Sequence, residues 1–509
     1  MSVKVFRSAR LISVLTLVSR VLGLGRDMAC SYAFGVGAIM SAWTIAFQIP
    51  NLFRRLFGEG ALTAASVPVF TERYTREGVE GLDDLAGRVV GLLAVLLGGI
   101  SVVADLVMLL IVWCCPLDET AGLILRLTII TLPFSALICV TALLGSLQNV
   151  MGRFAPAAAA PIVLNVFMIA GALGGSRLEP RAGIVVLAVA VVLAGIAQVV
   201  WLAWGLRRAG LRLRLRIDWH NPYVRRIAIT MLPMTAGLGA VQLNALLDPL
   251  LALWFVDDSG PAILSYAQRL YQFPLGVFAI ALATAIFPAL SRHAAEGDLD
   301  GLGRSLSRGI CVASFEALPC ALGMIVVRYP LIELLFNRGE FARAEDAVGR
   351  VAFALLMYAL GIWAFGINQL IVRAFYATGD VRTPLKASIA NVVVNFGLNL
   401  VLVQTPLREA GLALSSAITG TLQVSWLLWR FDRKLRVIEW RLIAGRVLRI
   451  VVAAAIMAMA VAAADRFHLI DYRTVIRLPA LILVGAASYV AAAYILRVRE
   501  LREMIGGSD

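Results

Sequence analysis

Arginines within apolar stretches are the residues of this sequence best suited to bind a ligand. They lie in the first, second and eighth apolar stretches, at Arg20, Arg26, Arg54 and Arg269. A charged side chain in hydrocarbon costs roughly 2.5–3.5 kcal/mol, so it is kept only where it faces protein or a water-filled cavity. A guanidinium donates hydrogen bonds in a fixed planar fork that matches phosphate oxygens. These positions therefore predict a site for an anionic, lipid-linked substrate.

The first stretch, LTLVSRVLGLGRDMA, places two arginines on either side of two glycines. On an ideal helix the six-residue offset between Arg20 and Arg26 turns about 240°, so the side chains would point in different directions. Because glycine loosens a helix, we expect both guanidiniums to be able to turn toward one cavity. The alternative is that Arg26 pairs with Asp27 near an interface while Arg20 reaches the membrane surface.

The second stretch, AFQIPNLFRRLFGEGALTAASVPVF, contains a proline followed by two adjacent arginines. Pro50 is predicted to kink or end the helix, with Arg54 and Arg55 about one turn later. Arg55 has Glu59 four residues on, which is a suitable local partner, whereas Arg54 has Gly58 at that spacing. Arg54 is therefore the better candidate for the substrate, with Arg55 and Glu59 in supporting roles.

The eighth stretch, SYAQRLYQFPLGVFAIALATAIFP, contains an arginine but no acidic residue. Arg269 precedes a second helix-breaking proline, Pro274, and its polar neighbours are Gln268 and Gln272. An arginine in such a span needs an anion from elsewhere, and phosphate oxygens suit its fork. The alternative is neutralisation by an acid on another helix, such as Asp105.

A second type of site is suggested by QLNALLDPL, in which Asn244 and Asp248 precede Pro249. Amide and carboxylate oxygens beside a broken helix could coordinate a monovalent cation. The alternatives are a packing hydrogen bond or an ion pair, for which Asp248 is also suited.

Signatures of cofactor chemistry and ATP hydrolysis are absent from the sequence. The six cysteines and three histidines show no metal-ligand spacing, and no P-loop, GxSxG or HExxH motif occurs. We therefore expect a transporter without a cofactor rather than an enzyme. Its energy source would be a sodium or proton gradient, the membrane potential or a downstream sink.

The composition places these arginines in a membrane protein. The 509-residue chain is 60% hydrophobic and only 15% charged, whereas soluble domains are about 45–50% apolar and about 25% charged. The net charge of +14 would suggest a nucleic-acid partner in a soluble protein. Here much of it lies in short loops, where it sets membrane topology, so no nucleic acid is expected.

Helices long enough to cross a bilayer account for most of the chain. A spanning helix needs about 20 mostly apolar residues, and windows of that length predict an all-α fold with about fourteen spans. They lie near 9–34, 38–70, 88–113, 121–148, 155–175, 182–206, 224–256, 261–290, 306–336, 346–376, 383–404, 408–429, 443–464 and 476–497. The first stretch resembles a signal peptide, but arginines interrupt it and no small-residue cleavage site follows, so we expect it to be retained.

Basic residues in the loops predict that both termini are cytoplasmic. Arginines are concentrated after spans 6 and 12 and in the C-terminal tail, within 207–216, 430–441 and 497–502. By contrast, the loops after spans 3 and 7, CCPLDET and VDDSGP, have no basic residue. Because cytoplasmic loops are enriched in arginine and lysine, an even number of spans with both ends inside is favoured.

The chain also contains an internal repeat. Segment 68–82 matches 288–302 in its proline, EG pair and GL pair, and MGRFAP (151–156) matches TGDVRTP (378–384) in position. Both pairs lie six spans apart, which predicts two six-helix lobes related without inversion, with substrate between them. The predicted parts are an N-lobe (1–217), a C-lobe (218–435), and spans 13 and 14 with a cytoplasmic tail (436–509).

Four blocks of sequence resemble the MurJ/MviN lipid II flippases of the MOP exporter superfamily. These blocks are SRVLGLGRD (19–27), AFQIPNLFRRLFGEGALTAASVPVF (46–70), YAQRLYQFPLGVFAIAL (266–282) and FYATGDVRTP (375–384). The resemblance implies a V-shaped, two-lobed transporter in the bacterial cytoplasmic membrane. It would flip lipid II, the undecaprenyl-diphosphate-linked disaccharide pentapeptide, outward for peptidoglycan synthesis, and cell-wall synthesis proteins are possible partners.

By motif, the resemblance implies that cavity arginines contact the diphosphate, at Arg20, Arg26, Arg54 and Arg269. Spans 13 and 14 would form a groove for the lipid tail. The chain departs from the family pattern where Ser41, Gln268 and Gln272 stand in place of frequent acids. Fewer acids make the cavity more positive, and they put in doubt a mechanism in which those acids carry a proton.

Other functions remain open from the sequence. An exporter of the same fold could move another polyprenyl-diphosphate-linked glycan of the O-antigen type, which shares the phosphate chemistry. A drug exporter would instead require acids that face the cavity, and the arginines argue against it. A non-transporting scaffold of the cell-wall machinery would leave the intramembrane arginines without a role.

Overall fold

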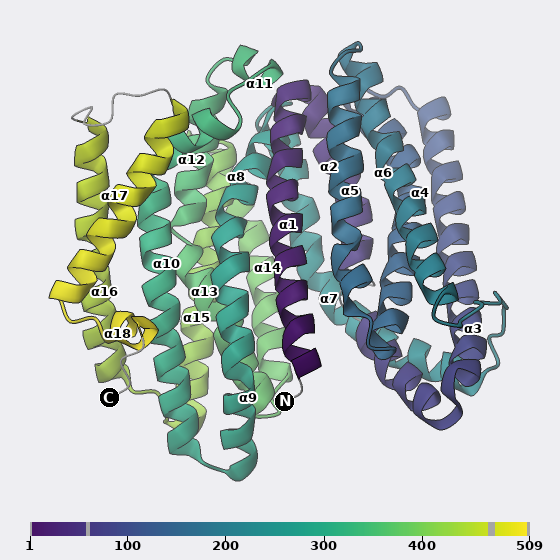
Figure 1. Cartoon of the computed structure of the whole chain (residues 1–509). Helices are drawn as coiled ribbons and strands as arrows, with labels where there is room; N and C mark the ends of the chain where they lie inside the picture. The colour runs from purple at the N-terminus through teal and green to yellow at the C-terminus, as the bar shows by residue number, and fades with distance from the viewer. Residues whose placement is uncertain (1–2, 57–61, 467–473, 506–509) are drawn as a thin grey trace. The chain divides into compact units, whose positions relative to one another are not determined.

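The computed structural model describes residues 3–56, 62–466 and 474–505, and the regular elements of that part of the chain are helices (Figure 1). The predicted all-α fold is therefore confirmed. In chain order the helices are α1 (Val3–Phe34), α2 (Ala38–Phe53), α3 (Leu62–Cys114), α4 (Glu119–Val150), α5 (Phe154–Gly175), α6 (Pro180–Arg207), α7 (Pro222–Phe255), α8 (Gly260–Pro274), the π-helix η2 (Leu275–Ala279), α9 (Ile280–Glu296), α10 (Leu299–Leu335), α11 (Glu340–Arg343), α12 (Ala347–Ala359), α13 (Ile362–Ala377), α14 (Arg382–Leu402), α15 (Glu409–Leu435), α16 (Trp440–Arg466), α17 (Thr474–Ile495) and α18 (Arg499–Ile505).

Ten helices in the described part of the chain are long and apolar enough to cross a membrane, or eleven if the bent pair α12–α13 forms one span. The remaining predicted spans fall on α1, α2 and α7, whose described residues do not meet that criterion. α2 has only 16 residues, and α1 contains three charged residues in its apolar stretch. The chain is a multi-pass membrane protein, and the count of about fourteen spans stays a prediction.

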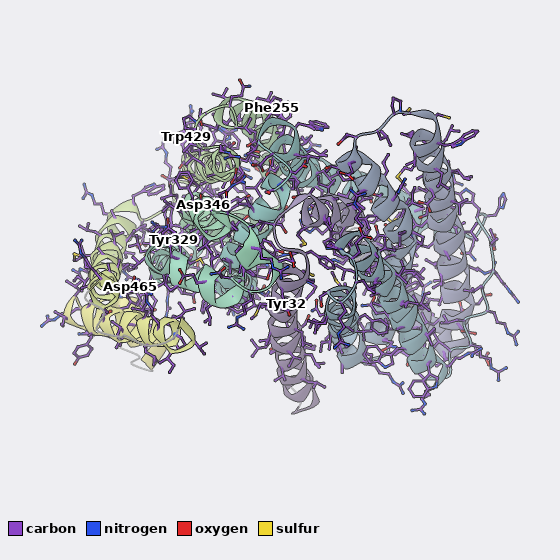
Figure 2. The ribbon with its side chains drawn as sticks, turned by 90° about the horizontal axis from the view of Figure 1, so that it is seen from above. Tyr32, Phe255, Tyr329, Asp346, Trp429 and Asp465 are labelled. Atoms are coloured by element: carbon purple, nitrogen blue, oxygen red, sulfur yellow. The ribbon has the colours of Figure 1, made fainter. Side chains whose placement is uncertain are left out.

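The outer surfaces of the helices are apolar. In the most apolar window of α3 only 11% of residues are buried within the protein, and side chains such as Val103 and Leu106 are exposed. Large apolar side chains elsewhere, including Phe255, Tyr329 and Trp429, also lie exposed (Figure 2). Contact with lipid explains this pattern, because water would penalise so much exposed hydrocarbon.

The helices divide into two compact units. Unit 1 comprises Met1–Leu250 and Arg338–Ala344, and unit 2 comprises Leu251–Asn337 and Glu345–Asp509. In unit 1, α4 packs against α2, α3 and α6, and α5 packs against α1 and α6. In unit 2, α10 packs against α12, α13 and α16, and α16 packs against α17 (Figure 1).

Small residues set the closest helix approaches, as expected where lipid supplies little drive for association. α5 and α6 meet at Gly175 and Gly183. A Cβ added at Gly175 would lie 2.5 Å from the carbonyl oxygen of Gly183, and one added at Gly183 would lie 2.4 Å from that of Gly175. Neither position could therefore hold a larger residue without moving a helix.

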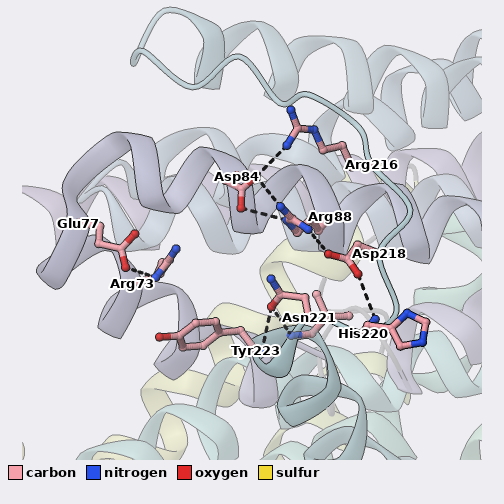
Figure 3. A network of polar contacts seen from close by, with 10 residues as sticks. Arg73, Glu77, Asp84, Arg88, Arg216, Asp218, His220, Asn221 and Tyr223 are labelled. Carbon is pink, nitrogen blue, oxygen red and sulfur yellow. Dashed lines mark hydrogen bonds and ion pairs between the residues drawn. The ribbon is translucent and has the colours of Figure 1, made fainter.

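The connection that follows α6 lies against α3 at Gly87, where the absence of a side chain lets the backbone of the connection approach the helix; we call this position the glycine notch. The Leu213 amide donates to Asp83 Oδ1 at 2.8 Å, and the Arg216 amide donates to the Gly87 carbonyl at 3.3 Å. Arg88 of α3 pairs with Asp84 at 3.0 Å and with Asp218 of the connection (Figure 3). The basic loop is thus fixed to α3 by backbone and ionic contacts.

The connection that follows α15 makes a comparable contact in unit 2. The Glu439 amide donates to Ser307 Oγ of α10 at 3.1 Å, and a Cβ added at Gly303 would lie 2.1 Å from the Val437 carbonyl oxygen. When the match of 68–82 with 288–302 is continued along the chain, Gly87 corresponds to Ser307. In each half of the predicted repeat, the connection that follows the sixth span thus contacts the corresponding position of a long helix, Gly87 in α3 and Ser307 in α10.

We expect Gly87→Ala to displace the 211–217 segment from α3. The added Cβ would lie 2.1 Å from the Arg214 carbonyl oxygen, and such overpacking costs about 1–3 kcal/mol. Hydrogen exchange of the Leu213 and Arg216 amides should therefore become faster. Gly98→Ala is the matched control in the same helix, because nothing lies within 4 Å of its added Cβ. Equal exchange rates in both variants would contradict the prediction.

A partly buried ion cluster joins three elements of unit 2. The Arg350 guanidinium at the start of α12 donates to Glu409 at 2.7 Å and Asp257 at 3.0 Å. Arg408 also pairs with Asp257. Glu409, at the start of α15, is 3% exposed. We call these four residues the ion clamp; they tie the α7–α8 connection to the first turns of α12 and α15.

Candidate functional site

Arg26 is held in a defined orientation inside unit 1. Its Nε and Nη2 donate to Asp27 Oδ1 at 2.9 and 2.7 Å, and its Nη1 donates to Asn165 Oδ1 of α5 at 3.2 Å. The side chain is only 12% exposed. The pair with Asp27, stated above as the alternative, is thus present, and Asn165 is a partner that the sequence analysis did not identify.

The contacts of Arg26 leave donor capacity for a ligand. A guanidinium has five N–H groups, and the three bonds above use one on each nitrogen. Each terminal nitrogen therefore keeps one N–H without a bond to the described residues. Two such donors on one rigid plane can donate two parallel hydrogen bonds to the oxygens of a phosphate group.

The glycines of α1 lie within a continuous helix that contacts α5. α1 is continuous from Val3 to Phe34, so the glycines do not interrupt it. Added Cβ atoms at Gly23 and Gly25 would lie 3.8 and 3.9 Å from side chains of α5, and the Asn165 amide donates to the Ser19 carbonyl at 3.0 Å. Added Cβ atoms would therefore make only ordinary contacts with α5, and it is the Asn165 side chain that links α5 to Ser19 and Arg26 of α1.

Arg20 lies on the same continuous helix and is half-buried. Its guanidinium makes no hydrogen bond or ion pair with the residues that the structure describes. Since α1 is unbroken, the ideal offset of about 240° between Arg20 and Arg26 applies. The two side chains therefore leave the helix in different directions.

The second helix ends one turn after its proline. Pro50 is buried in α2, which ends at Phe53, and residues 54–56 continue as a π-helical turn. Arg54 and Arg55 are both half-buried there, and Glu59 lies outside the described residues. The predicted pair of Arg55 with Glu59 therefore stays a prediction.

Arg55 contacts α7. Its Nη1 donates to Gln242 Oε1 at 3.2 Å, beside a small pocket lined by Gln48, Asn51, Leu52, Arg55, Gln242, Ala245 and Leu246. The Gln48 amide donates to the Ala245 carbonyl at 2.8 Å across the same contact. Arg54 does not line this pocket, so the structure gives adjacent arginines different surroundings, as their offset of about 100° requires.

In unit 2, Arg269 is half-buried on α8, with Gln268 and Gln272 half-buried beside it. α8 ends at Pro274 and continues as η2 before α9 begins, so the proline breaks the α-helix as predicted. π-helical turns are rare and occur often at functional sites. Arg269 thus stands just before a change in helix geometry.

The predicted cation site and the position of a frequent family acid both fall on helices of unit 1. Asp248 is half-buried in α7, and the side chain of Asn244 lies outside the described residues, so the cation site stays a prediction. Ser41, where an acid is frequent in the family, is fully buried in α2. Arg20, Arg26 and Arg54 belong to unit 1 and Arg269 to unit 2, and their facing a common cavity stays a prediction.

Helices of membrane length make up the regular structure of the described residues, and several of them carry guanidiniums, which is the architecture of a polytopic membrane transporter. A family model described as "Lipid II flippase MurJ" matches residues 30–483. The chain belongs to the lipid II flippase MurJ family. The family is one of transporters.

Individual relatives agree with this assignment. The probable lipid II flippase MurJ of Vibrio cholerae serotype O1 is 34% identical over 446 residues, which cover 84% of this chain and 83% of the relative. The lipid II flippase MurJ of Burkholderia cenocepacia is 31% identical over 438 residues, which cover 84% of each chain.

Solved structures support the fold. A structure described as "Lipid II flippase MurJ, inward closed conformation" has a TM-score of 0.76 at 23% identity and covers 97% of this chain and 99% of that one. An inward-facing multidrug resistance MATE family transporter of the MOP superfamily has a TM-score of 0.69 at 16% identity, covering 84% and 98%. This chain therefore has the fold of the MOP superfamily.

Proposed function

We propose that this chain flips lipid II, the undecaprenyl-diphosphate-linked precursor of peptidoglycan, from the inner to the outer leaflet of the bacterial cytoplasmic membrane. The observation that carries the proposal is Arg26. Asp27 and Asn165 hold its guanidinium in α1, and one N–H on each terminal nitrogen is left for a phosphate oxygen. Membership of the lipid II flippase family points to the diphosphate of lipid II as that anion.

The transport cycle follows from the two predicted lobes. Facing inward, Arg20, Arg26, Arg54 and Arg269 capture the diphosphate while the polyprenyl tail stays in lipid. Closure of the cytoplasmic side and opening of the outer side then expose the sugar-peptide head to the periplasm. Rocking of one repeat against the other is the usual form of such alternating access, and the break at Pro274 would serve as a hinge.

Topology and energy supply complete the proposal. The basic loops after α6 and α15 favour a cytoplasmic location for both termini by the positive-inside rule. A sodium or proton gradient or the membrane potential drives the cycle, without a bound cofactor. The tail groove would be formed by α16 and α17, which pack against each other and against α10 in unit 2.

Depletion of the native flippase in a host bacterium tests the function. Expression of this chain should restore growth and remove the lipid II that accumulates in the inner leaflet, measured by the fraction of lipid II accessible to a lipid II-cleaving toxin applied from the periplasmic side. A chain that reaches the membrane but leaves inner-leaflet lipid II unchanged would refute the proposal.

A second candidate is the flipping of another polyprenyl-diphosphate-linked glycan. It is favoured by one observation, because the guanidinium of Arg26 would recognise the diphosphate that such lipids share with lipid II. Reconstituted vesicles that contain both lipids distinguish the two functions. Movement of the other glycan lipid without movement of lipid II would establish this alternative.

A further inference from the structure

An acidic side chain lies midway along the longest described helix of unit 2. Glu316 belongs to the 37-residue α10, which is one of the helices long and apolar enough to cross a membrane. Its Oε2 atom is shielded from solvent and accepts no hydrogen bond from the described residues. Ionisable groups inside membrane spans are costly, and they commonly mark ion or proton pathways.

Glu316 borders a small apolar cavity between α8 and α9. The cavity is lined by Pro274, Leu275, Phe278, Ala279, Ala313, Glu316, Ala317, Cys320, Ile362 and Gly366. All lining residues except Glu316 and Cys320 are apolar or glycine. Four of them belong to the Pro274–η2 break, so the acid faces the segment in which the helix changes geometry.

No cation lines this cavity among the residues that the structure describes. The nearest titratable groups on α10 are the thiols of Cys320, one turn away, and Cys311, five residues away. The nearest basic groups on either side are Arg308, which pairs with Glu503 at 2.9 Å, and Arg328, which donates to the Ile325 carbonyl. Arg308 and Arg328 lie eight and twelve residues along α10, roughly 12 and 18 Å at 1.5 Å per residue.

The helices packed against α10 also direct their charges elsewhere. Arg373 of α13 donates to Thr284 of α9 at 2.8 Å, and Arg350 of α12 belongs to the ion clamp. The remaining charged or titratable residues of these helices, of α8 and of α18 are the basic Arg269, Arg292, His293, Arg441, Arg446, Arg449, Arg466, Arg477, Arg499 and Arg502, the acids Glu296, Asp465, Glu500 and Glu503, and the phenols Tyr266, Tyr271, Tyr358, Tyr376, Tyr489 and Tyr494. None of these residues lines the cavity.

A carboxylate in an apolar cavity without a cation is far less stable than the neutral acid. Glu316 therefore holds a proton while the Pro274–η2 break is packed against α10. If the break moves away and water enters, the O–H bond breaks, the proton passes to water, and a hydrated carboxylate is left. Repacking of the break requires that the carboxylate take up a proton again.

We propose that Glu316 is a proton-binding site of this chain, loaded when the Pro274–η2 break is packed against α10 and unloaded when the break opens to water. This inference deepens the proposed function, on which it rests for the opening of the break during transport. It identifies the proton as the coupling ion and gives the residue that carries it.

Infrared difference spectroscopy of the purified full-length chain in lipid nanodiscs tests the proton site. A pH change should produce the carbonyl-stretch band of a protonated carboxyl in an apolar environment. Glu316→Gln should remove that band, Glu316→Asp should retain a shifted band, and Asp105→Asn, which removes an acid of α3 in unit 1, should leave it unchanged. A spectrum of Glu316→Gln identical to that of the unsubstituted chain would overturn the proposal.

Proteoliposomes test the coupling separately. With one proton exchanged per lipid, a pH difference of one unit should change the leaflet ratio of lipid II by about tenfold, and Glu316→Gln should abolish that response while still equilibrating lipid II. An equal response in Glu316→Gln would overturn coupling through this residue. If the unsubstituted chain moved no lipid II, the proposed function would fail, and the infrared result would still decide whether Glu316 binds a proton.

Discussion

Arg26→Ala is expected to weaken lipid II binding by about 10- to 150-fold and to abolish complementation of a flippase-depleted strain. A hydrogen bond to a charged group contributes about 1.5–3 kcal/mol, which corresponds to that range of affinity. The alanine variant also leaves Asp27, which is 15% exposed, as an acid that repels the diphosphate. Binding to nanodisc-embedded protein and growth under depletion measure the two effects.

A lysine variant separates the positive charge of Arg26 from the planar arrangement of its N–H donors, and a surface variant serves as control. Arg26→Lys keeps the positive charge but loses the planar pair of donors, so we expect it to restore binding only in part. Arg76→Ala is the control, because that side chain is 66% exposed and pairs with Glu72 on the surface of α3. Full activity of Arg26→Ala at normal membrane levels of protein would exclude Arg26 from the site.

Arg350→Met is expected to lower the free energy of unfolding by about 3–5 kcal/mol. The substitution keeps an unbranched side chain but removes the cation from the ion clamp, and it leaves the Glu409 carboxylate buried without its 2.7 Å partner. Breaking a buried pair from one side has a cost of this size. Denaturant unfolding in detergent micelles measures the change.

The double variant Arg350→Met/Glu409→Gln should recover part of the loss, because the buried negative charge is gone. Arg308→Met is the surface control in unit 2. Its side chain is 63% exposed in the pair with Glu503, so its loss should cost at most about 1 kcal/mol. Equal losses for Arg308→Met and Arg350→Met would show that burial of the clamp has no energetic role.

The ion clamp also predicts how stability depends on pH. Burial raises the pKa of Asp257, but hydrogen bonds from Arg350 and the Ser259 amide, with the charges of Arg350 and Arg408, outweigh it and lower the pKa below its usual value. The contribution of Asp257 is therefore complete above the pKa of the unfolded chain and is lost as the pH falls through the folded value. Asp257→Asn should flatten this acid-side decline in melting temperature.

The helical fold could be predicted because it depends on local pattern. Long apolar stretches in α4, α6 and α10 are visible in a window of about 20 residues, and Pro274 marks its own helix break. Loop positions of Gly and Pro also locate several helix ends. The number of spans is harder to predict, since α1 contains charges and α2 has only 16 residues.

The contacts that orient the site could not be predicted, because their partners are far apart in the chain. Asn165 lies 139 residues from Arg26, and the Arg350–Asp257 bond joins residues 93 apart. For the Arg26 contact, the one signal in the sequence was the single amide of Asn165 in the otherwise apolar PIVLNVF stretch of α5. A polar residue in such a span usually has a specific partner, but the sequence does not say which.

The short π-helix after Pro274 has a consequence for how this protein can change. A π turn holds one residue more than an α turn, so η2 (Leu275–Ala279) acts as a one-residue spacer in a continuous helix. Deletion of one residue there would let an α-helix close and would rotate α8 by about 100° about the axis of α9. The direction in which Arg269 leaves α8 is therefore fixed by the number of residues in η2 rather than by their side chains. The segment should tolerate substitution far better than any change of length.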